Sequence, residues 1–176
     1  MRREARLGLI AFAVAGVIGL RWWQHQRQGD AERKQATLTE ATAAMTALNA
    51  ADDTFPAAVR EGLARVGALA AVRPAEAGVV LEREVVPLFD AYLVTLDGAV
   101  AAAERVLANR PDPAVARNVE LIRARGATTR TMRDALVELR GTIAAGATTD
   151  DIARAMSTIA FTALGDVVSP APAPSP

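Results

Sequence analysis

Cysteine is absent from the 176 residues, and histidine occurs once, at His25. The missing thiols exclude disulfide scaffolds, thiolate metal sites, covalently attached haem and cysteine nucleophiles. The chain also has no Glu-x-x-His pair of the kind that binds di-iron in helical bundles, and no glycine-rich phosphate loop or nucleophile elbow. We therefore predict that the protein is not an enzyme, with no catalytic residue, metal site or cofactor, and that His25 is a solvated residue beside a membrane segment.

Aromatic residues are scarce, at 4% of the chain, whereas alanine accounts for 40 residues. Beyond Trp23 the aromatic residues are Phe55, Phe89, Tyr92 and Phe161. A buried alanine removes less apolar area from water than a leucine does, at about 25 cal/mol per Å². The sequence therefore predicts a thin core, with part of the missing stabilisation supplied by a partner.

A net charge of either sign is also absent, because 20 basic and 20 acidic residues balance. The balance is uneven along the chain. Residues 1–36 carry seven basic and three acidic groups, a net charge of +4, so the remainder has a net charge of −4. An acidic domain without an aromatic platform is not expected to bind nucleic acid.

Fourteen apolar residues occupy positions 7–20, and basic residues flank them on both sides. With Trp22 and Trp23 the stretch reaches about 26 Å as a helix, slightly less than the hydrocarbon core of a bilayer, about 30 Å. Tryptophans gather at the membrane interface, and long arginine side chains reach the headgroups. We predict a retained single-pass anchor, with these interfacial residues: Arg6, Arg21, Trp22 and Trp23.

A cleaved signal peptide, which has a similar charged start and apolar stretch, is one alternative, and an ordinary buried helix is the other. The residues that follow, Arg21 to Gln28, offer no pair of small residues at a cleavage site, which favours retention. The short basic start and the acidic domain favour a cytoplasmic N-terminus, with the domain outside the cytoplasm, on the periplasmic side in a bacterium.

Small residues recur along one face of the predicted anchor. Small residues at this spacing let helices approach closely in lipid. The predicted packing face against another membrane helix consists of Gly8, Ala11, Ala15 and Gly19. Chance spacing in an alanine-rich chain is the alternative.

Apolar residues after position 30 recur at intervals of three and four, which predicts helices and no strands. The fold class is therefore all-α, a single N-terminal transmembrane helix followed by an alanine-rich bundle of four to five helices. The predicted organisation is a basic flank at 1–6, the anchor at 7–23, a juxtamembrane helical linker at 24–36, the bundle domain at 37–168 and a disordered proline-rich tail at 169–176.

Proline and cap-forming residues predict where these helices end. We expect a break at 52–56, where two aspartates and a threonine precede Phe55 and Pro56. Another end is expected at Arg73-Pro74, and Pro87 should kink or divide the segment 75–109. Asp112 and Pro113 are a natural N-cap and first-turn pair, and Gly146 followed by Thr148 or Thr149 predicts the last helix start.

Charged residues within the bundle suggest two further features. Glu82 falls on an apolar stripe with Val79, Val86 and Phe89, so it either faces the interior or pairs with an arginine at the rim. A basic band on one helix, either a solvated or a docking face, consists of Arg123, Arg130, Arg133 and Arg140.

These patterns together predict a non-enzymatic function. We predict a membrane-anchored accessory subunit that packs its anchor into a larger membrane complex, bioenergetic or of the envelope, and docks its bundle on it. The partners are integral membrane proteins and the lipid bilayer. The alternative is a membrane-anchored extracytoplasmic sensor or small-ligand-binding bundle with a pocket near Pro87 and Tyr92, whose ligand the sequence does not name.

Overall fold

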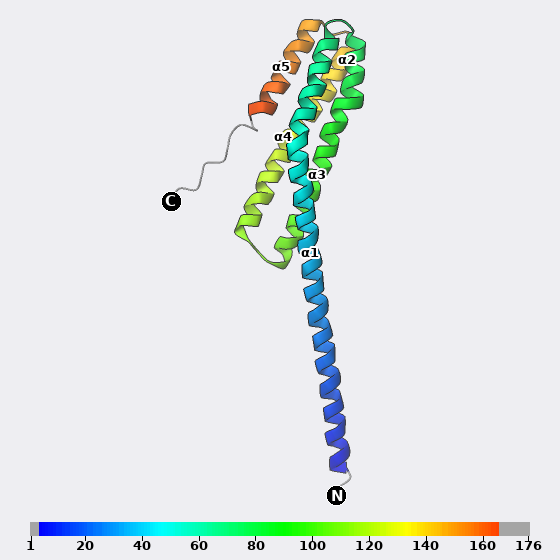
Figure 1. Ribbon diagram of the computed structural model, residues 1–176, viewed down its shortest axis with the longest axis vertical. Helices are drawn as coiled ribbons and strands as arrows, with labels where there is room; N and C mark the ends of the chain where they lie inside the picture. The colour runs from blue at the N-terminus through cyan, green and yellow to red at the C-terminus, as the bar shows by residue number, and fades with distance from the viewer. Residues whose placement is uncertain (1–3, 166–176) are drawn as a thin grey trace, which may run out of the picture.

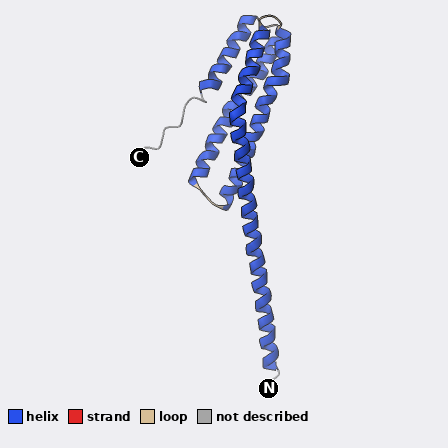
Figure 2. Cartoon of the chain, in the orientation of Figure 1, coloured by secondary structure: helices blue, strands red, loops and turns tan. Residues whose placement is uncertain are grey.

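The computed structural model describes the backbone of residues 4–165 and the side chains of residues 31–159. The described backbone contains no strand (Figure 2), so the predicted all-α class is confirmed. The elements are the helices α1 (Glu4–Ala70), α2 (Pro74–Val80), α3 (Val86–Asn109), α4 (Pro113–Ala144) and α5 (Thr149–Gly165), with a π-helix, η1 (Leu81–Val85), between α2 and α3. The predicted tail at 169–176 lies outside the described residues.

Helix α1 is a single helix of 67 residues, about 100 Å long at 1.5 Å per residue. Its C-terminal part packs within the bundle, and its N-terminal part projects beyond the other helices (Figure 1). We call the end of the bundle nearer this projection proximal. The connection between α3 and α4 lies there, and the α1–α2 and α4–α5 connections lie at the opposite, distal end.

The predicted break at 52–56 is wrong, because α1 continues through Pro56. Proline removes the N–H that would donate to the carbonyl of Asp52, which weakens a helix interior. Tertiary contacts of two residues that precede Pro56 offset this loss. The Phe55 ring packs on two rings of α3, and the Asp52 carboxylate accepts hydrogen bonds from α3 and α4.

Two apolar clusters form the core. The distal cluster draws on every helix, and its largest fully buried side chains are Val66, Leu81, Val85, Phe89, Leu136 and Ile152. The proximal cluster comes from α1, α3 and α4 alone, and consists of Leu48, Tyr92, Leu96, Ala99 and Ile122. Phe55 packs against both clusters and therefore joins them. Helix α3 lies between α1 and α4, which make little direct backbone contact with each other.

The segment stays helical from Pro74 to Asn109, and its one departure from α-helical geometry is the π-helix, which ends at Val85, two residues before Pro87. A π turn takes up one extra residue, so the inward face shifts by one position. Ala77 of α2 and Leu81, the first residue of η1, are buried, whereas Val79 and Glu82 of the predicted stripe are exposed. The interior placement of Glu82 is therefore wrong, and its pairing with an arginine is right, since Arg140 lies 3.2 Å away.

The helix starts predicted at Asp112 and at Thr148 or Thr149 are confirmed by their hydrogen bonds. The Asp112 carboxylate accepts from the backbone N–H groups of Ala114 and Val115, at 2.8 and 3.3 Å. At the last connection Gly146 has φ +88°, a left-handed conformation that glycine adopts without strain. The Thr148 hydroxyl then accepts from the Asp151 N–H at 3.3 Å, and this hydroxyl lowers the pKa of the Asp151 carboxyl.

By length and composition, one segment among the described side chains could cross a membrane, namely Pro74–Asn109, with a mean hydropathy of 1.5. It lies within the bundle rather than at the N-terminus. The predicted anchor at 7–23 has a helical backbone, but its side chains lie outside those described. The predicted packing face and the predicted interfacial residues also lie outside the described side chains.

Candidate functional site: the polar network around α3

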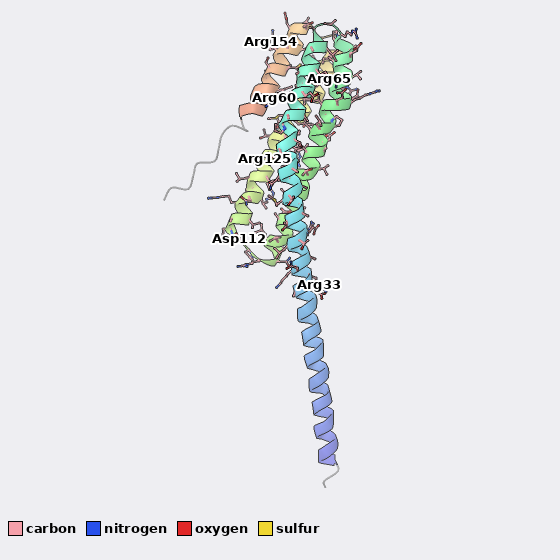
Figure 3. The ribbon with its side chains drawn as sticks, viewed as in Figure 1. Arg33, Arg60, Arg65, Asp112, Arg125 and Arg154 are labelled. Atoms are coloured by element: carbon pink, nitrogen blue, oxygen red, sulfur yellow. The ribbon has the colours of Figure 1, made fainter. Side chains whose placement is uncertain are left out.

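A buried tyrosine joins three helices near the middle of the bundle. The Tyr92 hydroxyl of α3 donates to the Asp52 carboxylate of α1 at 2.5 Å, and Arg125 Nη1 of α4 donates to the same carboxylate at 2.6 Å. Arg125 Nη1 also lies 3.5 Å from the tyrosine oxygen. Figure 3 shows Arg125 partway along the bundle, between its two ends. The cluster therefore connects α4 to α1, two helices that otherwise make little backbone contact.

Aromatic rings cover the apolar side of this cluster. The Phe55 and Tyr92 rings stack with centroids 4.1 Å apart and planes 10° apart. The Phe55 and Phe89 rings meet edge to face, with centroids 5.1 Å apart. Burial, together with the hydrogen bond to Asp52, raises the pKa of Tyr92 to about 12. The phenol therefore keeps its proton at neutral pH, which suits a structural donor rather than a general base.

Ion pairs line the seam between α4 and the α3–η1 segment. They are Glu104–Arg123, Asp97–Arg130 at 2.6 Å, Asp90–Arg133 at 3.0 Å and Glu82–Arg140 at 3.2 Å. The predicted docking face thus becomes an intramolecular seam, in which each of its four arginines contacts an acidic residue of a neighbouring helix. A docking role for these arginines stays a prediction.

Further pairs join α1 to the opposite side of the same segment. Arg105 of α3 lies 2.6 Å from Glu40, and Arg65 of α1 pairs with Glu84 of η1. The paired side chains on both seams are about half exposed, so each pair contributes on the order of 0.2–1 kcal/mol. Their larger effect is on register, because a one-turn slip of either neighbour would separate several pairs at once.

The described side chains contain no group of three His, Cys, Asp or Glu residues that could hold a metal ion. His25 and the residues named for the anchor, Gly8, Ala11, Ala15, Gly19, Arg6, Arg21, Trp22 and Trp23, lie outside this part of the chain. The polar groups that do converge satisfy one another. Carboxylates meet guanidinium groups, and the tyrosine hydroxyl meets a carboxylate. Such an arrangement positions helices and presents charge.

Sequence reasoning missed the acidic half of this network. Asp90, Asp97 and Glu104 are spaced by seven residues, and so are Arg123 and Arg130, and Arg133 and Arg140. Residues seven apart share a helix face, so the matching intervals indicate two helices paired along their length. Asp52, Tyr92 and Arg125 carry no comparable signal, since three different helices supply them.

Comparison of the chain with protein-family models, with curated proteins and with solved structures finds no match.

Proposed function

We propose that the protein is a non-enzymatic accessory subunit, anchored in a membrane by residues 7–23, whose bundle docks on a larger membrane complex of bioenergetic or envelope type. In this proposal the bundle has four helices: α1, the continuous α2–η1–α3 segment, α4 and α5. The observation that supports it is the continuity of α1. One helix leads from the predicted anchor to the core residues Leu48 and Val66 without a break.

A continuous helix transmits position and orientation, whereas a flexible linker does not. Glu40 of α1 pairs with Arg105 of α3, and residues 24–39 lie between the predicted anchor and this ion pair. That interval spans about 24 Å as a helix. Side chains 31–36 are exposed, and Figure 3 shows Arg33 on the part of α1 that projects below the bundle. The bundle would thus stand at a defined height above the bilayer, where a partner of matching height can meet it.

The proposed test begins with native membranes solubilised in a mild detergent, followed by identification of the proteins that co-migrate with the full chain. We expect a membrane complex larger than the chain alone. The control is Val14→Arg in the predicted anchor, since arginine at the centre of a span costs roughly 2.5–3.5 kcal/mol. This variant should leave the membrane fraction. A wild-type chain found in the soluble fraction, or migrating alone, would contradict the proposal.

Orientation can be tested on the same protein because it lacks cysteine. A cysteine introduced at Ala36 should react with an impermeant maleimide added outside the cytoplasm, and one introduced at Arg3 should not. The reverse pattern would place the bundle in the cytoplasm. The alternative, a ligand-binding sensor with a pocket near Pro87 and Tyr92, gains no support from the geometry. Pro87 is exposed, and the Tyr92 ring and hydroxyl are occupied by Phe55 and Asp52.

A further inference from the structure

Helix α1 has one internal proline, Pro56, and it lies between the two apolar clusters of the bundle. A proline lacks the N–H that donates to the carbonyl four residues earlier, and sharp bends of long helices occur at prolines. In α1 that carbonyl belongs to Asp52. Leu48 precedes this position and packs in the proximal cluster, whereas Val59 follows it and packs in the distal cluster. The turn of α1 that the proline interrupts therefore lies at the boundary between the two clusters.

The two parts of α1 are held by different helices. After Pro56, side chains of α5 reach α1: the Thr149 hydroxyl donates to the carbonyl of Ala70 at 3.4 Å, and a Cβ atom added at Gly67 would meet Met156 at 3.8 Å. Before Pro56, the described residues of the proximal cluster come from α1, α3 and α4, with none from α5. We call these parts of the three helices the proximal half. Fewer elements therefore have to separate for the proximal half to open than for the whole bundle.

The polar cluster lies at the same level and joins α1 to α3 and α4. The Asp52 carboxylate accepts from Tyr92 and from Arg125, so the residue whose carbonyl loses a backbone partner also makes the side-chain link to both helices. The Arg125 side chain is 52% exposed and that of Asp52 is 33% exposed. Water can therefore replace each partner when the contact breaks, and opening leaves no buried charge without a partner.

We propose that the proximal half opens as a unit by bending of α1 at Pro56, and that the polar cluster around Asp52 is the latch that holds it closed. Regions with few buried apolar contacts open at a lower free energy than the rest of a protein, in cooperative units. Opening exposes the proximal cluster, while the distal cluster stays closed beneath α5. The part of α1 that projects beyond the bundle lies on the same side of Pro56 as the opening half (Figure 1), so its direction and the state of the latch are connected. This inference does not rely on the proposed membrane anchor.

Hydrogen exchange of the full chain in mild detergent, read peptide by peptide with mass spectrometry, tests opening by halves. In the wild type, amides at 44–52 should be protected about tenfold less than those at 59–66. Tyr92→Phe removes one bond of the latch and should speed exchange at 44–52 about tenfold further, without a change at 59–66. The matched control is Arg65→Gln, which removes an ion pair of α1 after Pro56 and should leave 44–52 unchanged.

Three results of the exchange experiment would overturn the proposal. Equal protection of the two segments in the wild type would show that the halves open together. Acceleration of both segments by Tyr92→Phe, or of neither, would show that the cluster does not act as a latch on the proximal half. A response of 44–52 to Arg65→Gln would show that the two parts of α1 are not independent.

Spin labels test the bend directly, and cysteines can be introduced for labelling because the chain has none. The proximal pair, Thr46→Cys and Ala124→Cys, and the control pair, Ala64→Cys and Glu138→Cys, lie on exposed sites of α1 and α4. In the Tyr92→Phe background, double electron–electron resonance should give a second, longer distance for the proximal pair and a single distance for the control pair in the distal half. Two distances for both pairs, or one for both, would overturn the proposal.

Restoration of the missing hydrogen bond tests the position of the bend. Pro56→Ala supplies an N–H to the carbonyl of Asp52 and favours the straight helix, because alanine suits a helix interior far better than proline does. Combined with Tyr92→Phe it should remove the second distance and slow exchange at 44–52 again. A second distance that persists would place the bend elsewhere and overturn the hinge. An unchanged control distance shows in each variant that the distal half is folded, so unfolding of the whole bundle is not mistaken for opening.

Discussion

The distal and proximal halves of the bundle are stabilised in different ways. Helix α5 covers α1 and α4 in the distal half, where Phe89, Leu136 and Ile152 are fully excluded from water. The proximal half has no such cover, and its smaller apolar cluster is supplemented by the polar cluster Asp52–Tyr92–Arg125. The comparison shows how an alanine-rich chain with few aromatics retains a defined structure where its core is thin. In the proximal half, which α5 does not cover, the chain places a buried tyrosine that hydrogen-bonds to a carboxylate.

The largest expected difference comes from one substitution made in each half. Leu136→Ala removes a side chain enclosed on all sides, and we expect it to lower the free energy of unfolding by about 4–5 kcal/mol. Leu48→Ala should cost about 2–3 kcal/mol, because three helices can close over the space more readily than a complete bundle can. Urea denaturation followed by circular dichroism measures both. Equal losses would show that the two halves pack alike.

Removal of one hydroxyl tests the proximal half. Tyr92→Phe keeps the stacked ring but leaves the Asp52 carboxylate with Arg125 alone, at an expected cost of about 1–2 kcal/mol. Asp52→Asn should cost a similar amount. Because the two groups share one hydrogen bond, the double variant should lose less than the sum of the two single losses. Strictly additive losses in urea denaturation would contradict a direct coupling.

The same tyrosine predicts a change at alkaline pH. Its pKa is about 12 in the folded chain against the ordinary tyrosine value of 10.0, so above pH 10 the unfolded chain gives up the phenolic proton first. This contribution to stability is fully present below pH 10 and is lost as the pH rises through 12. Denaturation midpoints measured from pH 9 to 11.5 should fall more steeply for the wild type than for Tyr92→Phe. Parallel curves would contradict the prediction.

Two glycines give opposite results for one substitution. At Gly62 of α1 an added Cβ would lie 2.9 Å from Val85 Cγ2, a buried methyl group of η1, so Gly62→Ala forces the helices apart. We expect a net loss of about 1 kcal/mol, from overpacking partly offset by helix propensity. Gly98→Ala meets no neighbour and should gain up to about 1 kcal/mol. Thermal unfolding compares them, and a gain at Gly62 would mean that α1 and η1 do not approach this closely.

The smallest effect is expected at the seam between α3 and α4. Asp97→Asn removes one half-exposed pair with Arg130 and should cost about 0.2–1 kcal/mol. The loss should diminish at 1 M NaCl, since salt screens exposed charges. A loss that is independent of salt in urea denaturation would indicate a packing effect instead of an electrostatic one.

Local patterns predicted the all-α class and most helix ends. A proline or glycine next to a cap-forming residue specifies a helix start through atoms a few residues apart, as Asp112 and Thr148 do. The same local reasoning failed at Pro56 and at Glu82, for different reasons. At Pro56, contacts with α3 and α4 outweigh a local preference for a break. At Glu82, an extra residue in the π turn shifts a helical face that periodicity alone places inward.

The linear order of the residues was thus sufficient for what depends on near neighbours along the chain: the all-α class, most helix ends and their caps. Only the tertiary structure decided which residues meet across helices. Asp52, Tyr92 and Arg125 come together because α1, α3 and α4 pack with one register, and the four predicted arginines acquire partners for the same reason. Such pairings depend on the relative position of whole helices, which is set by the sum of many weak contacts rather than by any local pattern.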